Sequence, residues 1–238
     1  MRYLIIGDPS GGHSLQLIGK GIDASDIVVW EDSPKGQYCV KMRGVRVVND
    51  LEELKGMKFD VVIGNPPYGP GGNQAIRFLN IAGDYSDDIR LILPTSVRKD
   101  HSVNKIRDDF ICVEDIDLPE DTFPGSITVV RQRWVKSKTK RPKIETHTTH
   151  PDFEFVSYED RFNADVFIGI KGGGPAGRVK TENFHHYADT GHHLIKCSKE
   201  IKERLVSLEP QFREVALKLQ IPSFGKHDLI TVYKDNFG

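Results

Sequence analysis

Residues 59–68 constrain the fold of this chain more than any other segment, because an apolar run leads directly into two prolines. Residues 61–63 are Val-Val-Ile, three apolar β-branched residues, which is typical of a strand covered on both faces of a parallel sheet. Pro66 and Pro67 cannot donate a backbone hydrogen bond, so the strand ends before them. The segment predicts a rigid turn at the carboxyl end of a central strand, and in open α/β sheets ligands bind at that edge.

The surrounding sequence alternates between short apolar runs and amphipathic segments, which predicts an α/β fold. We expect strands at residues 3–7, 27–31, 45–48, 60–64, 89–93, 112–116 and 127–135, and helices at residues 13–20, 74–82 and 103–109. Asp50 marks a capped helix start. Beyond residue 140 short alternating runs follow, with one expected helix at about residues 199–208. We therefore expect a larger α/β domain over residues 1–140 and a small α+β region over residues 141–238.

The composition is that of an ordinary globular protein, with 38% hydrophobic and 28% charged residues in a chain of 238. No apolar run approaches the ~20 residues of a membrane span, and the N-terminus lacks a signal-peptide layout. Cys39, Cys112 and Cys197 are few and widely spaced, so we expect reduced thiols and no disulfide frame. These features predict a cytoplasmic protein.

The net charge of −1 conceals an uneven distribution. Residues 84–121 are rich in acid, whereas residues 131–143 contain seven basic residues and no acid. A basic run attracts phosphates, although a solvated linker has the same composition. The candidate nucleic-acid contacts in this run are Arg131, Arg133, Lys136, Lys138, Lys140 and Arg141.

The turn at residues 65–68 reads Asn-Pro-Pro-Tyr and follows Phe-Asp-Val-Val-Ile-Gly. This pattern resembles the catalytic motif of S-adenosylmethionine-dependent amino-methyltransferases, which act on N6 of adenine in DNA, on RNA, or on glutamine in release factors. The resemblance implies that the Asn65 side-chain carbonyl and the Pro66 backbone carbonyl accept the hydrogens of the target amine. It also implies that Pro67 belongs to the catalytic turn and that Tyr68 stacks on the planar target. The alternative is a structural turn that Asn65 merely begins.

A second motif follows the first expected strand, where residues 8–14 read Asp-Pro-Ser-Gly-Gly-His-Ser. It resembles the cofactor motif of the methyltransferases, Asp-Pro-x-x-Gly-x-Gly, with Ser14 in place of the last glycine. Small residues let the backbone approach a ligand, and free N–H groups at the helix N-terminus suit the methionine carboxylate of the cofactor. A P-loop is disfavoured because His13 replaces its lysine. The cofactor-binding residues implied here are Asp8, Pro9, Gly11 and Gly12.

Acidic residues follow the next two expected strands. Glu31 is the first choice to accept hydrogen bonds from the cofactor ribose, and Asp32 is the second. The resemblance places Asp50 beside the adenine moiety and Asn65 beside the transferred methyl group. Taken singly, each acid is also compatible with a surface position or a helix cap. Their order at successive strand ends favours the cofactor interpretation.

The order of the motifs along the chain indicates which class of amino-methyltransferase the sequence resembles. Fifteen residues separate Asp50 from Asn65, too few for a recognition domain, so we expect target recognition in residues 141–238. This arrangement resembles the gamma class of N6-adenine methyltransferases and the Eco57I-like enzymes, including small phage-borne versions. That family has a Rossmann-like seven-stranded sheet whose last strand is antiparallel. Phe123, in a Phe-Pro loop common to that group, would form the wall opposite Tyr68, although burial in the core is equally compatible.

We therefore expect a site-specific methyltransferase that transfers the methyl group of S-adenosylmethionine to the N6 amine of adenine in DNA. An RNA or protein-glutamine methyltransferase remains open. A non-catalytic nucleic-acid-binding protein on the same fold also remains open, because His13 and Ser14 depart from the cofactor motif. We expect no metal site at His185, His186, His192 and His193, because adjacent histidines do not share a helical face.

Overall fold

The computed structural model describes residues 1–119, 122–123, 128–172, 174–182, 191–217 and 223–238. The contacts within the chain divide it into an N-terminal unit, Met1–Ile144, and a C-terminal unit, Glu145–Gly238. We treat each unit separately. No helix in the described part of the chain is long and apolar enough to cross a membrane.

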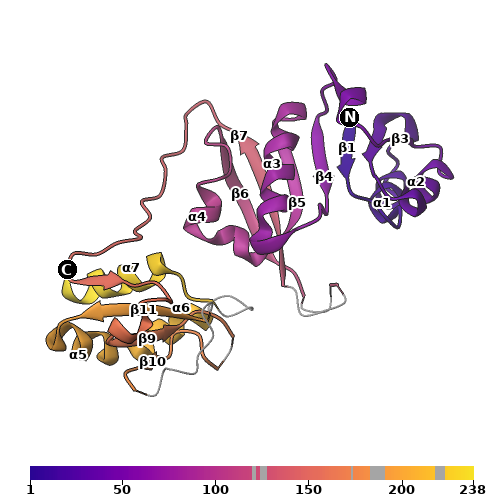
Figure 1. The fold of residues 1–238 in the computed structure, drawn as a ribbon. Coiled ribbons are helices and arrows are strands. Elements are labelled where there is room, and N and C mark those ends of the chain that lie inside the picture. The colour runs from indigo at the N-terminus through magenta and orange to yellow at the C-terminus, as the bar shows by residue number, and fades with distance from the viewer. Residues whose placement is uncertain (120–121, 124–127, 173, 183–190, 218–222) are drawn as a thin grey trace. The chain divides into compact units, whose positions relative to one another are not determined.

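The N-terminal unit is built on a seven-stranded sheet in the order β3-β2-β1-β4-β5-β7-β6 (Figure 1). Its strands are β1 (Tyr3–Ile6), β2 (Ile27–Trp30), β3 (Arg46–Val48), β4 (Val61–Gly64), β5 (Asp88–Pro94), β6 (Phe110–Asp117) and β7 (Val129–Lys136). Strand β7 is antiparallel to both β5 and β6, whereas β1 to β5 pair in parallel. The α/β class and the seven-stranded sheet with an antiparallel last strand are therefore confirmed.

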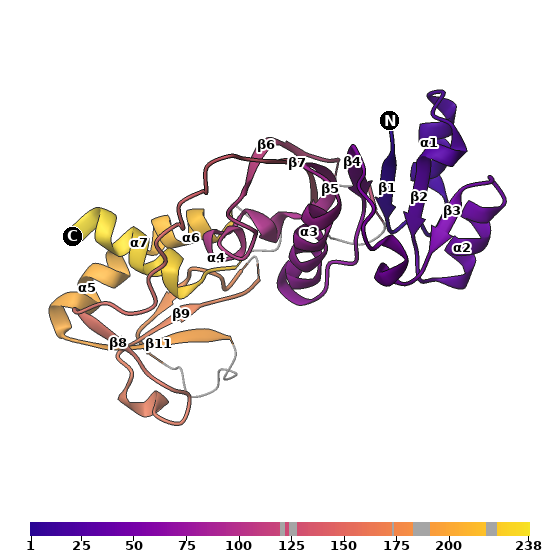
Figure 2. The same ribbon diagram turned by 90° about the horizontal axis from the view of Figure 1, so that it is seen from above.

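Helices lie on both faces of this sheet. The helices are α1 (Gly12–Gly19), α2 (Pro34–Lys41), α3 (Asn73–Tyr85) and α4 (Asp100–Val103), with 3-10 turns at Ala24–Asp26, Leu51–Leu54, Pro70–Gly72 and Thr95–Arg98. Leu17 of α1 and Val40 of α2 pack on Ile5 on one face, whereas α3 packs on the other face and lies alongside β5 (Figure 2). Helix α2 was not predicted, although Ser33 and Pro34 form its N-terminal cap and first turn.

The strand order reverses between β1 and β4, and this switch point positions the site. In the register of the sheet, Ile6 of β1 pairs with Trp30 of β2 on one side and with Gly64 of β4 on the other. The residues that follow these three positions therefore emerge together at the carboxyl edge of the sheet. The turn predicted at residues 65–68 leaves the sheet at this edge.

The C-terminal unit has a four-stranded antiparallel sheet in the order β10-β9-β11-β8. Its elements are β8 (Phe153–Phe155), a 3-10 turn (Arg161–Asn163), β9 (Val166–Gly169), β10 (Val179–Lys180), β11 (His192–Cys197), α5 (Lys199–Ser207), α6 (Glu209–Leu217) and α7 (Lys226–Phe237). The expectation of one helix was wrong, because α6 and α7 follow α5. Helix α7 contains the β-branched run at residues 230–232, yet it buries Leu229, Ile230 and Tyr233 on a helical face.

Candidate functional site

A cavity of about 450 Å³ lies at the switch point of the N-terminal sheet. This volume falls in the range of small-molecule sites. The lining residues come from the ends of β1, β2 and β4, from α3 and from the loop before β7: Ile6, Gly7, Pro9, Trp30, Glu31, Asp32, Asn65, Pro66, Pro67, Tyr68, Phe78 and Phe123. The cavity thus brings together the complete Asn-Pro-Pro-Tyr turn, both acids after β2 and Phe123.

The turn at residues 65–68 is fixed at both ends. The Asn65 amide donates to the Ile6 carbonyl at 3.2 Å, and the amides of Gln74 and Ala75 donate to the Tyr68 carbonyl at 3.0 and 3.2 Å. Inside the turn, the Tyr68 hydroxyl donates to Asn65 Oδ1 at 2.6 Å. Burial raises the pKa of Tyr68 to about 12, so this phenol keeps its proton at neutral pH. Asn65 therefore presents a carbonyl oxygen whose orientation is held by a neutral donor.

Two glycines allow the backbones of β1 and β4 to approach each other at the cavity. Gly7 has a φ of 72°, and a Cβ there would lie 2.8 Å from the Asn65 carbonyl oxygen. Gly64 has a φ of 155°, and a Cβ there would overlap the Ile6 carbonyl. Side chains at either position would force the turn away from the end of β1. The geometry of Asn65 consequently depends on glycine at both positions.

Asp8 stabilises the loop between β1 and α1 from inside. Its side chain is 1% exposed, and its two oxygens accept from the amides of His13 and Ser14 at 3.0 and 2.9 Å. Two of the helix N–H groups that we expected to be available for the methionine carboxylate, those of His13 and Ser14, are thus occupied by Asp8. The Ser14 hydroxyl is buried and donates to the Gly11 carbonyl at 3.0 Å. Ser14 therefore replaces the last glycine of the motif without entering the cavity.

The two acids after β2 differ in their surroundings. Glu31 is 5% exposed, and its oxygens accept from the amides of Asp8 and Ser33, each at 2.8 Å. Its carboxylate joins the loop after β1 to the loop after β2. The side chain of Asp32 is exposed and lines the same cavity. Asp32, our second choice from the sequence, is therefore the acid with more room for a ligand.

Aromatic side chains form an apolar wall that the sequence did not reveal. The rings of Trp30 and Phe78 lie 4.9 Å apart with an interplanar angle of 47° and both line the cavity. Trp30 ends β2, directly before the expected acids, and this position was the available signal. Phe78 lies on the apolar face of α3 and is indistinguishable in sequence from a core residue. Neither Ile6 nor Gly7 was predicted to be part of the site.

Four residues predicted to bind the cofactor lie outside the cavity lining, namely Asp8, Gly11, Gly12 and Asp50. Asp50 caps the 3-10 turn at Leu51–Leu54, where its side chain accepts from the Glu52 amide at 3.0 Å. Gly11 and Gly12 begin α1, and the guanidinium of Arg43 packs closely against Gly11. The structure gives these residues a local structural role.

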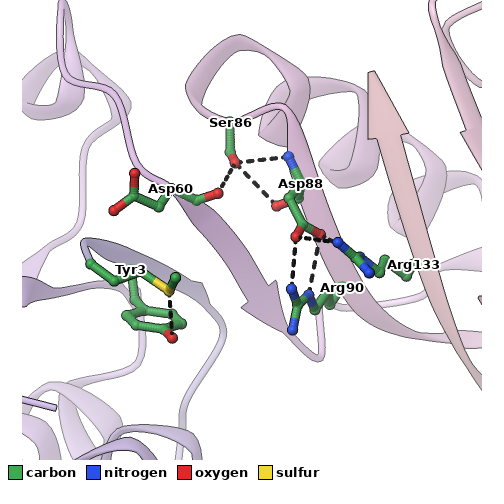
Figure 3. A network of polar contacts seen from close by, with 7 residues as sticks. Tyr3, Asp60, Ser86, Asp88, Arg90 and Arg133 are labelled. Carbon is green, nitrogen blue, oxygen red and sulfur yellow. Dashed lines mark hydrogen bonds and ion pairs between the residues drawn. The ribbon is translucent and has the colours of Figure 1, made fainter. Parts of the chain in front are cut away.

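The basic run is largely paired with the acid-rich segment. Figure 3 shows Arg133 and Arg90 on the same carboxylate, Asp88, at 2.9 and 2.7 Å. The other ion pairs are Arg131–Glu114 at 3.1 Å, Lys136–Asp87 at 3.3 Å and Lys140–Asp108 at 3.2 Å. Arg141 donates to the carbonyls of Val103 and Ile106, whereas Lys138 is exposed. Acids on neighbouring elements thus offset most of the charge of the run.

The structure describes one of the two histidine pairs considered in the sequence, His192 and His193. His193 is buried, and its Nε2 lies 2.9 Å from the Phe224 carbonyl. Burial lowers the pKa of His193 to about 4, so its ring is neutral at physiological pH. His185 and His186 lie outside the described residues. Within the described residues, no three His, Cys, Asp or Glu side chains group as metal ligands.

A scan against protein-family models finds no match for this chain, and a search of the curated proteins finds none. Among solved structures, the chain is similar to PH1948 from Pyrococcus horikoshii, described provisionally as an RNA methyltransferase, with 20% identity, a TM-score of 0.45, and coverage of 58% of this chain and 74% of that chain. It is also similar to the 23S rRNA methyltransferase ErmE, with 16% identity, a TM-score of 0.41, and coverage of 61% and 64%.

The M protein of the type I restriction enzyme EcoKI is a third similar structure, with 12% identity, a TM-score of 0.43, and coverage of 60% of this chain and 42% of that chain. These identities and TM-scores carry no argument about activity. The function proposed below therefore rests on the geometry of this chain's own site.

Proposed function

We propose that the chain is an S-adenosylmethionine-dependent methyltransferase whose target is the exocyclic amine of a nucleobase, N6 of adenine in DNA. The observation that carries the proposal is the sheet register at the switch point. It sets Gly7, the acids after β2 and the Asn-Pro-Pro-Tyr turn around one cavity of about 450 Å³. A methyl donor and an amine acceptor both need to reach this volume.

The cavity suits S-adenosylmethionine, which supplies the methyl group when bound. Gly7 provides a cradle that a Cβ would fill, Trp30 and Phe78 provide an apolar surface for a planar base, and Asp32 provides acceptors for a ribose diol. Asp8 and Glu31 hold the two loops in place through backbone hydrogen bonds. In this proposal the exposed Asp32, not Glu31, takes the ribose.

Asn65 would act directly on the target amine. A nucleobase amine is a poor nucleophile because its lone pair is delocalised into the ring. Asn65 Oδ1 has two lone pairs, of which the Tyr68 hydroxyl uses one, so the other can accept an amine hydrogen. With the Pro66 carbonyl accepting the second hydrogen, the lone pair would localise on nitrogen. The nitrogen would then form the N–CH3 bond as the S–CH3 bond of the sulfonium breaks, with S-adenosylhomocysteine as the leaving group and one amine proton released to solvent. Tyr68 and Phe123 line the same cavity and would hold the planar base between them.

Radiolabelled S-adenosylmethionine tests the proposal directly. The purified chain is incubated with unmethylated DNA, with RNA and with a protein lysate, and the label is followed into each fraction. We expect label in DNA as N6-methyladenine and its loss in Asn65→Ala. Label in RNA or protein would redirect the proposal to that substrate, and no label in any fraction would refute methyl transfer.

One observation favours a second candidate, a nucleic-acid-binding protein without activity. Asp8 already occupies the amides of His13 and Ser14, which removes one place for the methionine carboxylate of the cofactor. Isothermal titration with S-adenosylmethionine distinguishes the two candidates before any activity assay. Saturable heat that disappears in Gly7→Val supports the methyltransferase, whereas no heat supports the binding protein.

A further inference from the structure

The C-terminal unit contains a groove of about 650 Å³ that the proposed chemistry does not use. It lies between the segment before β8, the end of β11 and the start of α7. Its polar lining includes two threonines, one histidine, two acids and two lysines: Thr148, Thr149, His150, Asp152, Glu154, Lys196 and Lys226. Every lining residue belongs to the C-terminal unit, so the groove is complete within it.

The two lysines of the groove differ from the basic run in their partners. Lys196 and Lys226 are exposed, and no described carboxylate lies within 4.0 Å of either ammonium. The Lys226 ammonium lies 4.5 Å from the centre of the Phe155 ring, which holds its charge at the groove. A phosphate can approach these two cations without first breaking an ion pair.

The two acids of the groove equal its lysines in number, but neither is in an ion pair with Lys196 or Lys226. The Asp152 carboxylate accepts from the Tyr233 hydroxyl at 2.8 Å, so one of its oxygens is turned toward α7. Glu154 stands opposite Lys196 in the β8–β11 register. His150 Nδ1 accepts from the Asp152 amide at 3.2 Å, so a neutral ring carries its proton on Nε2 as a donor. Lysine and threonine side chains are among the groups that contact the phosphates of nucleic acids.

We propose that this groove binds the phosphodiester backbone of the target nucleic acid, with Lys196 and Lys226 each neutralising one phosphate. The inference rests on the proposed function in that it takes a nucleic acid as the substrate. It assigns backbone contact to the C-terminal unit and not to the paired residues of the basic run. Backbone contacts fix the position of a strand without reading its sequence.

Fluorescence anisotropy with labelled oligonucleotides tests the groove without cofactor and without methyl transfer. The full-length chain, Lys196→Ala/Lys226→Ala and Lys196→Arg/Lys226→Arg are titrated against single-stranded DNA, duplex DNA and RNA at several salt concentrations. We expect the alanine variant to reduce the slope of log K against log salt by about 2, one per lysine, and the arginine variant to retain it. A preference among the three probes would identify the strand that the groove takes.

A matched variant controls for the loss of charge. Lys171→Ala/Lys202→Ala removes two positive charges from the same unit at positions that do not line the groove, and we expect it to leave the slope unchanged. Circular dichroism confirms that each variant is folded. Equal slopes for the groove variant and the wild type would overturn the inference. If the slopes are equal and the chain still methylates, the groove inference fails and the proposed function stands. If binding depends on the groove but no methylation occurs, the proposed function fails and the groove inference stands.

Discussion

The cavity of the N-terminal unit and the groove of the C-terminal unit differ in how their polar groups are satisfied. In the cavity, Glu31 and Asn65 accept hydrogen bonds that fix their orientation at the ends of strands, and Asp8 does the same in the loop behind it. In the groove, Lys196 and Lys226 are exposed, and no carboxylate in the described part of the chain lies within 4.0 Å of either ammonium. Preorganised acceptors suit a reacting amine, whereas exposed cations suit a flexible charged backbone. This difference supports placing the proposed chemistry in the N-terminal unit and the proposed nucleic-acid backbone contact in the C-terminal unit.

A sequence run of positive charge is therefore a poor guide to the binding surface. Acids lie beside Arg131, Arg133 and Lys136 because β5, β6 and β7 are neighbours in the sheet, and Lys140 pairs with Asp108 in the loop before β6. Lys196 and Lys226 are separated by thirty positions in sequence, yet they line one groove.

Asn65→Ala should affect chemistry and leave binding intact. Loss of the amide acceptor should lower the methyl-transfer rate about 10²–10³-fold, the range found when one preorganised polar group is removed from an active site. Single-turnover kinetics measure the rate, and anisotropy measures oligonucleotide affinity. The double variant Lys196→Ala/Lys226→Ala should have the opposite effect to Asn65→Ala, because it should weaken affinity and leave the single-turnover rate unchanged. If the Asn65 variant and the lysine variant each changed both the single-turnover rate and the oligonucleotide affinity, the proposed separation of chemistry and binding between the two units would be wrong.

Acid should destabilise the C-terminal unit through His193. Its pKa is about 4 when folded and 6.5 in an unfolded chain, so the unfolded state binds more protons between these values. This stabilisation is fully present above pH 6.5 and is lost as the pH falls toward 4, at a cost on the order of 3 kcal/mol. Both tryptophans, Trp30 and Trp134, lie in the N-terminal unit, so their fluorescence isolates that unit. Circular dichroism should show an acid-sensitive transition that the fluorescence lacks.

His193→Gln provides the control for this prediction. The variant removes the titrating ring, so unfolding midpoints measured by circular dichroism should depend less on pH between 6.5 and 4. An unchanged pH dependence would mean that another group is responsible.

Gly7→Ala should damage the N-terminal unit alone. The new Cβ would meet the Asn65 carbonyl in a left-handed conformation, and we expect a loss of about 1–3 kcal/mol in the free energy of unfolding. Urea unfolding followed by tryptophan fluorescence measures it. Gly19→Ala is the matched control, because a Cβ there meets nothing within 4 Å at the end of α1 and should be neutral or stabilising. Equal effects of the two substitutions would contradict the close approach of the backbones.

Tyr68→Phe should have a modest effect on the rate. The ring that would stack on the target remains, but the hydroxyl that orients Asn65 Oδ1 is lost. A neutral hydrogen bond contributes about 0.5–1.5 kcal/mol, so kcat should fall about two- to tenfold with little change in KM for the nucleic acid. Tyr85→Phe is the control, since its hydroxyl makes a long 3.5 Å contact with the Leu51 carbonyl outside the cavity. A change in KM without a change in kcat would contradict the orienting role.

Arg131→Ala/Lys140→Ala should have the smallest effect. Both side chains are in surface ion pairs, which are worth roughly 0–1 kcal/mol, so stability should change little. Anisotropy should show affinity for the oligonucleotide within about twofold of wild type. The groove variant removes the same number of cations and should weaken binding more. If the basic-run variant weakened binding more than the groove variant, the basic run would be the better candidate for nucleic-acid contact.

Much of the N-terminal unit was predictable because its strands are short apolar runs at regular intervals. The segment expected at residues 60–64 is β4 (Val61–Gly64), and the segment expected at residues 27–31 is β2 (Ile27–Trp30). The elements that were missed have weaker local patterns. Helix α2 is short and polar, and α7 combines a helical apolar face with β-branched residues. Tertiary burial decided both, because propensity differences are small beside the free energy of packing an apolar face.

The sequence by itself determined the α/β class, the strand that ends in Asn-Pro-Pro-Tyr, and the acids that follow β2. These features are local, since apolar β-branched runs, prolines and strand-end carboxylates act through their immediate neighbours in the chain. Tertiary structure alone decided that Asp8 occupies the amides of α1, that Asp32 and not Glu31 is exposed to the cavity, and that the basic run is paired. The burial of Glu31 against the Asp8 amide and the pairing of the basic run depend on contacts between segments distant in sequence. The contacts of Asp8 with His13 and Ser14 are local, but they depend on the folded geometry of the loop, which the residue types do not specify.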